Sequence, residues 1–149
     1  MKVIYSAKWA DGFRSSADAN KVATEISNIG EDVTPKQIVD YARDSATELH
    51  KCFDWNDESA AEKYRMWQAR NVINHLVFEK TEDDTSAHEL RMFFKTTDDG
   101  GYKPTLVIMK NEDEYKALLE RAKRELRGFQ QKYKSLKELQ PVFEVIDLL

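Results

Sequence analysis

The chain has 149 residues, of which 41% are hydrophobic and 34% are charged, and its formal net charge is −4. This composition excludes a disordered chain, and the length fits one domain with its own core. No apolar run reaches the roughly 20 residues of a membrane-spanning helix, and Cys52 is the single cysteine, which excludes a disulfide framework. The apolar stretch at the N-terminus is too short for a signal peptide, so we expect a cytoplasmic protein. The negative charge argues against non-specific coating of nucleic acid but allows a local basic face.

A strand and a helix are predicted at the start of the chain. Residues 2–9 alternate between apolar and polar side chains, as in a half-buried strand. Ser15 or Ser16 would cap a helix over residues 16–29, and Gly30 follows its last apolar residue, where glycine commonly ends a helix.

The next segment carries a capping box. Thr34 is the expected N-cap, Pro35 takes the first helical position, and Gln37 completes the box, so the pattern predicts a helix over residues 35–43. Ser45 begins a second pattern with capping-box spacing, which predicts a short turn of helix before residue 53.

The longest predicted helix in the first half of the chain spans residues 57–74, with Asn56 as its N-cap. Apolar residues recur along two sides of this helix at helical spacing, so we expect it to contact more than one partner. The two stripes consist of Ala60, Tyr64 and Trp67 and of Met66, Ala69, Ile73 and Leu76. Core packing against a sheet is the expected role of the aromatic residues in and before this helix (Phe53, Trp55, Tyr64 and Trp67). The alternative is that an exposed subset forms a protein-binding hot spot.

Strands followed by helices are predicted in the second half. Apolar residues at 76–78 continue the long helix into a strand, and alternation predicts another strand over 88–95. The turn-forming residues 96–101 lead into a returning strand over 102–109. Asn111 with Glu114 would cap a long helix with a continuous apolar stripe up to residue 133. A final helix would begin late or be kinked, because Pro141 lies too far into it.

The expected fold class is α+β. A small antiparallel sheet of about three or four strands would pack against a layer of helices, with a C-terminal helical hairpin. We expect a single domain over 1–149, with an α+β core over 1–110 and the helix pair over 111–149. The order of elements also resembles a winged helix, in which the helix 57–74 would be the recognition helix.

Patterns typical of catalysis or cofactor binding are weak. No GxxxxGK or GxGxxG loop is present, which argues against a nucleotide cradle. His50, Cys52 and Asp54 are two residues apart and would point in different directions on a helix, so structural roles are the expectation. His50, His75 and His88 lack the short spacings of zinc or iron ligands. The sequence therefore predicts no enzyme, no metal and no cofactor.

A polar set on the helix 57–74 is the candidate nucleic-acid-binding site. Lys63, Arg70 and Asn74 recur at spacings of seven and four, and Arg65 lies on the adjacent strip. Two features argue against a recognition helix: thirteen residues separate Arg43 from residue 57, and acidic residues at the start of the helix would repel phosphates. A solvated face is the simpler alternative.

The segment 33–73 resembles a pattern in small uncharacterised proteins of bacteriophages and prophages, where a TPxxVVxxAR-type helix precedes a PLHxxFxWDDxxAAxxYRxxQAR helix. Those proteins also end in a helix like LRxxxxKYxxLxEL, similar to residues 126–139 here. Two departures are Ala46–Glu48 in place of a proline before Leu-His, and Pro141 in the last helix. The matching residues are Thr34, Pro35, Val39, Ala42, Arg43, Leu49, His50, Phe53, Trp55, Ala60, Ala61, Tyr64, Arg65, Gln68, Ala69 and Arg70.

The resemblance implies a mobile genetic element in a bacterial cytoplasm and carries over no site residues. We therefore expect a non-enzymatic accessory protein that acts by binding, with DNA or a DNA-processing or regulatory complex as its target. The alternative is a protein–protein interaction or virion-assembly component, or a homodimer, that uses the C-terminal helices.

Overall fold

The computed structural model describes residues 6–56, 61–79 and 90–149. Helices and strands are mixed, which confirms the predicted α+β class. The elements in chain order are β1 (Ala7–Trp9), α1 (Ala19–Ile29), α2 (Pro35–Ala42), the 3₁₀ helix η1 (Leu49–Cys52), α3 (Ala61–Asn74), β2 (Leu76–Phe78), β3 (Phe93–Lys95), β4 (Tyr102–Pro104), α4 (Thr105–Lys110), α5 (Glu112–Tyr133), the 3₁₀ helix η2 (Lys137–Leu139) and α6 (Gln140–Ile146).

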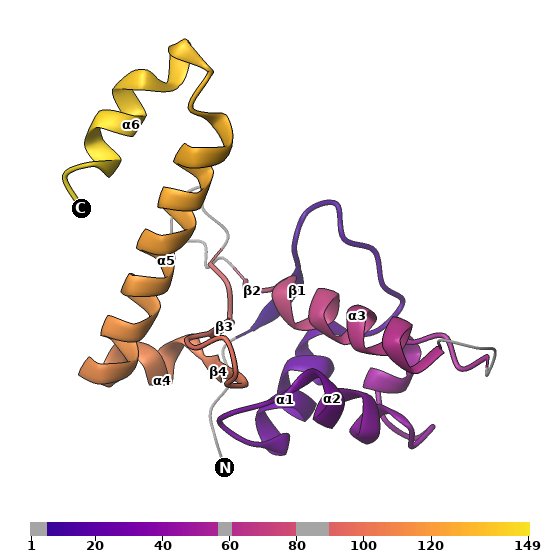
Figure 1. The fold of residues 1–149 in the computed structure, drawn as a ribbon. Coiled ribbons are helices and arrows are strands. Elements are labelled where there is room, and N and C mark those ends of the chain that lie inside the picture. Colours follow the sequence, from indigo (N-terminus) through magenta and orange to yellow (C-terminus); the bar gives the residue numbers. More distant parts are fainter. Residues whose placement is uncertain (1–5, 57–60, 80–89) are drawn as a thin grey trace.

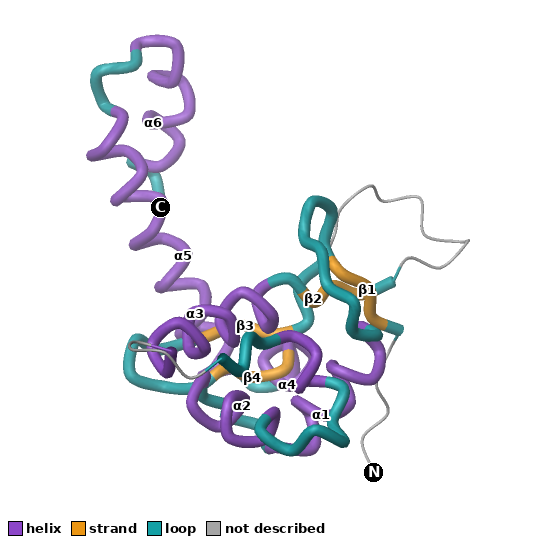
Figure 2. Tube along the Cα trace, turned by 90° about the vertical axis from the view of Figure 1, so that its right-hand side faces the viewer, coloured by secondary structure: helices purple, strands orange, loops and turns teal. Residues whose placement is uncertain are grey.

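The molecule has a helical part and an extended hairpin, with the strands between them (Figure 1). Helices α1, α2 and α3 pack together on one side, and α4 with the start of α5 lies on the other. The remainder of α5, with α6 folded back along it, stands clear of the rest of the protein in both views (Figures 1 and 2). Among the described residues, no helix has the length and hydrophobicity needed to span a membrane.

Among the described residues the strands form two small sheets, whereas the sequence predicted one sheet of about three or four strands. β1 pairs antiparallel with β2, and β3 pairs antiparallel with β4. An isolated bridge between Val77 and Arg91 connects β2 to the residues before β3, and a bridge between Val33 and Tyr102 connects β4 to the start of α2. These bridges hold the helical part and both sheets around one core.

The core is built mainly by the helices of the first half. Each of α1, α2 and α3 buries one side, and the buried residues include Val22, Ala23 and Ile26, Ile38, Val39 and Ala42, and Ala69, Val72 and Ile73. The spacing of these residues is the helical period of the sequence, so the amphipathic pattern decides which side of each helix enters the core.

In the first half of the chain, one described helix start follows the predicted chemistry and two depart from it. The capping box of α2 is confirmed, since the Thr34 side chain accepts from the Gln37 N–H and the Gln37 side chain accepts from the Thr34 N–H. The predicted caps Ser15 and Ser16 are wrong, because Asp18 accepts from the first N–H groups of α1. Ser45 is likewise not the cap of the next turn.

Asp44 organises that turn instead. Its carboxylate accepts from the Ala46 N–H, and its backbone carbonyl accepts from the Thr47 N–H and hydroxyl. Asp at such a position folds its side chain back onto the backbone more strongly than Ser does. The residues 57–60, where the start of the central helix was predicted, lie outside the described residues, as do residues 2–5 of the first strand and His88.

The returning strand predicted over residues 102–109 is wrong beyond residue 104. Pro104 has no N–H for the sheet and its φ of −60° suits the start of a helix, so α4 begins at Thr105. The strand predicted before it is also shorter than expected, since β3 covers only Phe93–Lys95 of the described residues, and Phe93 is buried whereas Leu90 is exposed. An apolar run as short as 106–109 is compatible with a strand or with a helix. Pro104 favours the helix here, because it cannot donate to a sheet and suits a helix start.

The C-terminal hairpin was predicted, and the late start of its second helix is confirmed. Asn111 caps α5 by accepting from the Asp113 and Glu114 N–H groups, and Pro141 lies in the first turn of α6. α6 buries Phe143 and Ile146 against α5. None of the 22 residues of α5 is buried, so its apolar stripe is largely open to solvent.

Candidate nucleic-acid interface

Helix α3 has one buried side and one exposed side. Ala69, Val72 and Ile73 are buried against α2 and the strands. Of the two apolar stripes predicted on this helix, only the stripe through Ala69 and Ile73 is buried in the core. The opposite side carries the residues that could bind a ligand.

Arg65 was predicted as a nucleic-acid-binding residue, and this prediction is wrong because the residue is buried. Its side chain is only 3% exposed. The guanidinium lies over the ring of Trp55, donates from Nε to the carbonyl of Asp54 at 3.0 Å, and lies 3.6 Å from a carboxylate oxygen of Glu62. These contacts fix the chain before α3 onto the helix, so the role of Arg65 is structural.

Lys63 and Arg70 are exposed on the outer side of α3. Their spacing of seven residues is two helical turns, so both cations lie on one strip of the helix, as predicted. Asn74 continues the strip but is partly buried, and its Oδ1 accepts a hydrogen bond from Arg91. The structure thus brings together two of the four predicted residues as exposed cations without an ion pair among the described residues, and it gives the other two structural partners.

An exposed aromatic pair lies beside these cations. Tyr64 is 49% exposed and Trp67 is 55% exposed, and their rings stack with centroids 5.7 Å apart. Their predicted role in the core is therefore wrong. The spacing in the sequence could have predicted this exposure. Trp67 is four residues after Lys63 and three before Arg70, which places it on the polar strip.

A groove runs along one side of α3, between the helix and the loop after β1. Its volume is about 490 Å³, and its lining includes Phe13, Arg14, Trp67, Asn71 and His75. Phe13 and His75 stack with centroids 4.6 Å apart. The loop residues were not predicted as site residues, because their approach to α3 depends on the pairing of β1 with β2.

The acidic start of α3 is partly neutralised. Both carboxylate oxygens of Glu62 accept hydrogen bonds from Arg43, at 2.7 and 2.8 Å. The Glu62 hydrogen bond raises the pKa of Arg43 above its ordinary value. This pairing weakens one of the two arguments against a nucleic-acid-binding face, because the charge of Glu62 is no longer free to repel phosphates.

The trio His50, Cys52 and Asp54 does not form a catalytic arrangement in the described structure. His50 uses Nδ1 to contact the Ala42 carbonyl oxygen at 2.8 Å and stacks on Trp55. Burial raises the pKa of Cys52 to about 11, which disfavours a nucleophilic thiolate. Within the described parts of the chain, no group of three or more His, Cys, Asp or Glu residues could hold a metal ion.

The fold and this face define an α+β protein with a cationic and aromatic surface on its central helix. No protein-family model matches the chain, and comparison with curated proteins and with solved structures gives no significant match.

Proposed function

We propose that the protein acts by binding nucleic acid through the outer side of α3, without catalysis. The observation that carries the proposal is the stacked pair of Tyr64 and Trp67, exposed on the same side of the helix as Lys63 and Arg70. Exposed aromatic rings give bases a surface on which to stack, and neighbouring cations bind the phosphates.

The groove beside α3 supports single-stranded DNA as the preferred form. It adds Arg14 and the stacked rings of Phe13 and His75 to the surface that a strand would follow. A base that leaves the helical stack can enter such a groove, whereas a paired base in a duplex cannot. The net charge of −4 agrees with a local site and disfavours binding along the whole surface.

The order of elements supports a winged-helix-like plan for the same function. Helices α1, α2 and α3 precede the β3–β4 hairpin, which would take the position of a wing. The long connection between α2 and α3 differs from a tight helix-turn-helix. A phage or prophage accessory role remains the setting that we propose from the resemblance in residues 33–73.

The test is binding of labelled single-stranded and duplex DNA at about 50 and about 200 mM salt. We expect tighter binding of the single strand and quenching of Trp67 fluorescence, since Trp67 is the exposed tryptophan of the three. The variant Lys63→Ala/Arg70→Ala should lower the salt dependence for single strands by about 1.4 in log–log slope, because it removes two phosphate contacts. Trp67→Ala should weaken binding without changing that slope.

A matched control is Lys21→Ala/Lys36→Ala, which removes two exposed cations from α1 and α2 and changes the net charge equally. This control should bind like the unaltered protein. Equal losses in the control and in Lys63→Ala/Arg70→Ala would show that only net charge matters. No binding of either DNA form at micromolar protein would overturn the proposal.

The second candidate is self-association through α5, and the open apolar stripe of that helix favours it. Tyr115, Leu119, Leu126 and Phe129 are all exposed on one side. The first turn of α5 is acidic, whereas its last part and the following residues are basic. An antiparallel pair of α5 helices would place opposite charges together, so the partner that fits is a second copy of the chain.

Sedimentation at several protein concentrations tests this candidate. We expect a dimer that Leu119→Glu/Leu126→Glu converts to a monomer, while Lys116→Glu, at an exposed position of the same helix, leaves the dimer intact. A monomer for the unaltered protein at all concentrations would contradict self-association.

A further inference from the structure

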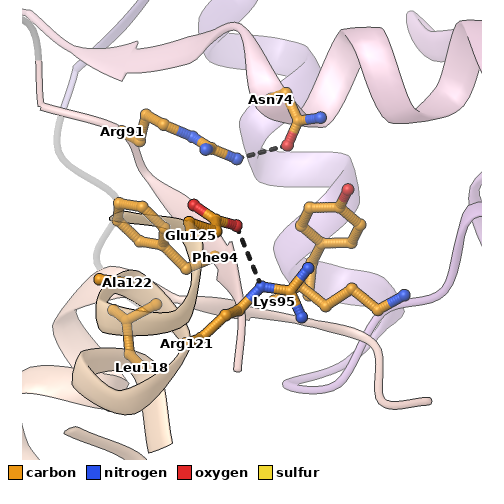
Figure 3. Close-up of a pocket in the computed structure, with 9 residues that line it drawn as sticks. Asn74, Arg91, Phe94, Lys95, Leu118, Arg121, Ala122 and Glu125 are labelled. Atoms are coloured by element: carbon orange, nitrogen blue, oxygen red, sulfur yellow. Dashed lines mark hydrogen bonds and ion pairs between the residues drawn. The ribbon is translucent and has the colours of Figure 1, made fainter. Parts of the chain in front are cut away.

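The side of α5 that faces α3 and β3 is distinct from the apolar stripe of this helix. Leu118, Arg121 and Ala122 line a cavity of about 440 Å³ on that side, and a carboxylate oxygen of Glu125 lies 3.7 Å from Nε of Arg121 (Figure 3). Leu119 follows Leu118, and each residue turns a helix by about 100°, so Leu119 lies on the next side. The residues that face the cavity therefore leave the apolar stripe uncovered.

Helix α6 covers part of the second half of the stripe, whereas the first half is open to solvent. Phe143 of α6 is buried, and its ring centroid lies 6.4 Å from that of Phe129. α6 lies along the C-terminal part of α5 (Figure 1). Nearer the start of α5, Tyr115, Leu119 and Leu126 are all exposed. The hairpin thus has a step, with α6 on one half of α5 and a bare apolar surface on the other.

Helix α6 also has an exposed apolar side of its own. Val142 and Val145 of α6 and Leu149 after it recur at spacings of three and four, and all three are exposed. They differ from Phe143 and Ile146, which are buried where α6 packs on α5. α6 is therefore apolar on two sides, and only one of them meets α5 of the same chain.

Given the self-association proposed above, we infer that the open half of the stripe, Tyr115–Leu126, receives the outer side of α6 from a second copy. Each copy gives its α6 and accepts the partner's, so the dimer has twofold symmetry. α6 rests on the second half of its own α5, and antiparallel pairing places it opposite the first half of the partner's α5. The lengths agree, because the seven residues of α6 span about 10 Å and the open half about 17 Å.

Charges at the two ends of the hairpin support this arrangement. The first turn of α5 carries Glu112 and Asp113, the turn after α5 carries Lys134 and Lys137, and all four residues are exposed. In the antiparallel dimer, the turn of one copy reaches the first turn of α5 in the other, so acids face cations at both ends. Direct pairing of two α6 helices is disfavoured, because residues 140–149 contain two acids and no cation.

Val145→Ser tests the contact without changing the residues that pack α6 on α5. We expect the Kd of the dimer, measured by sedimentation, to rise roughly tenfold, because an apolar contact is lost twice in a symmetric interface. Leu90→Ser is the matched control, since Leu90 is 56% exposed and Val145 is 60% exposed, and Leu90 lies outside the hairpin. This control should dimerise like the unaltered protein.

A disulfide between two copies locates the contact. Leu119→Cys and Val145→Cys are prepared as separate proteins, mixed and oxidised, with the unaltered protein, which contains Cys52 alone, as the background. We expect position 119 to link to position 145 of the other protein faster than either position links to itself. A dimer that Val145→Ser leaves unaltered, or that links only position 119 to position 119, would overturn this contact and leave self-association standing. A monomer of the unaltered protein at all concentrations would overturn both.

Discussion

The guanidinium of Arg65 lies 4.8 Å from the centroid of the Trp55 ring, and the same side chain donates to the carbonyl of Asp54. Trp55 in turn donates from its ring N–H to the carbonyl of His50 at 2.9 Å. These contacts join η1 and the chain after it to α3, and so set the position of the face that carries Lys63 and Arg70.

Arg65→Ala should therefore destabilise the fold. The substitution removes a buried charged hydrogen bond and the cation–π contact, so we expect a loss of about 2 kcal/mol in the free energy of unfolding. Urea denaturation measures it. Arg70→Ala is the control, since an exposed substitution on the same helix should change the free energy by less than about 0.5 kcal/mol. Equal losses in the two variants would contradict the structural role of Arg65.

Thr34→Ala should cost about 1 kcal/mol of stability, because Thr34 accepts from the Gln37 N–H and caps α2. Ser45→Ala tests the cap that the sequence predicted and the described structure does not use, and it should be nearly neutral. Thermal unfolding of the two variants side by side checks both statements. A larger loss of stability in Ser45→Ala than in Thr34→Ala would contradict the assignment of Thr34, and not Ser45, as a helix cap.

The contact between Glu114 and Lys103, at 2.7 Å, joins α5 to β4 and should make stability depend on pH. The Lys103 hydrogen bond lowers the pKa of Glu114 below its ordinary value of 4.5, and the Glu114 hydrogen bond raises the pKa of Lys103 above 10.5. The Glu114 contribution is complete above pH 4.5 and is lost as the pH falls through the lowered pKa of the folded protein. The Lys103 contribution is complete below pH 10.5 and is lost as the pH rises through the raised pKa.

Glu114→Gln should thus unfold more easily than the unaltered protein at neutral pH, by about 1 kcal/mol, and the difference should vanish in acid. Urea denaturation at several pH values measures this. Lys116→Gln, at an exposed position two residues further along α5, is a control that should show no such trend. A difference that persists in acid would mean that the ion pair is not its cause.

Cys52 should react slowly with alkylating reagents. The rise of its pKa from 9.0 to about 11, caused first by burial, reduces the thiolate fraction near pH 8 about a hundredfold. Its rate of reaction with iodoacetamide, compared with that of free cysteine, measures this. The rate should rise steeply on unfolding in urea. A folded-state rate equal to that of free cysteine would contradict the burial of the thiol.

The sequence by itself determined the local features that depend only on interactions between residues close in the chain. The capping box of Thr34 and Gln37, the cap at Asn111 and the late start forced by Pro141 were all readable, because each depends on backbone groups close in the chain.

Only the tertiary structure decided which side of α3 meets solvent and which of its cations are exposed there. Arg65 and Lys63 look alike in the sequence, but Trp55 and Asp54 reach Arg65 and leave Lys63 exposed. Likewise, Arg91 meets Asn74 only because β2 pairs with the residues before β3. Charge and hydrophobicity are properties of a residue, whereas burial and pairing depend on segments far apart in the chain.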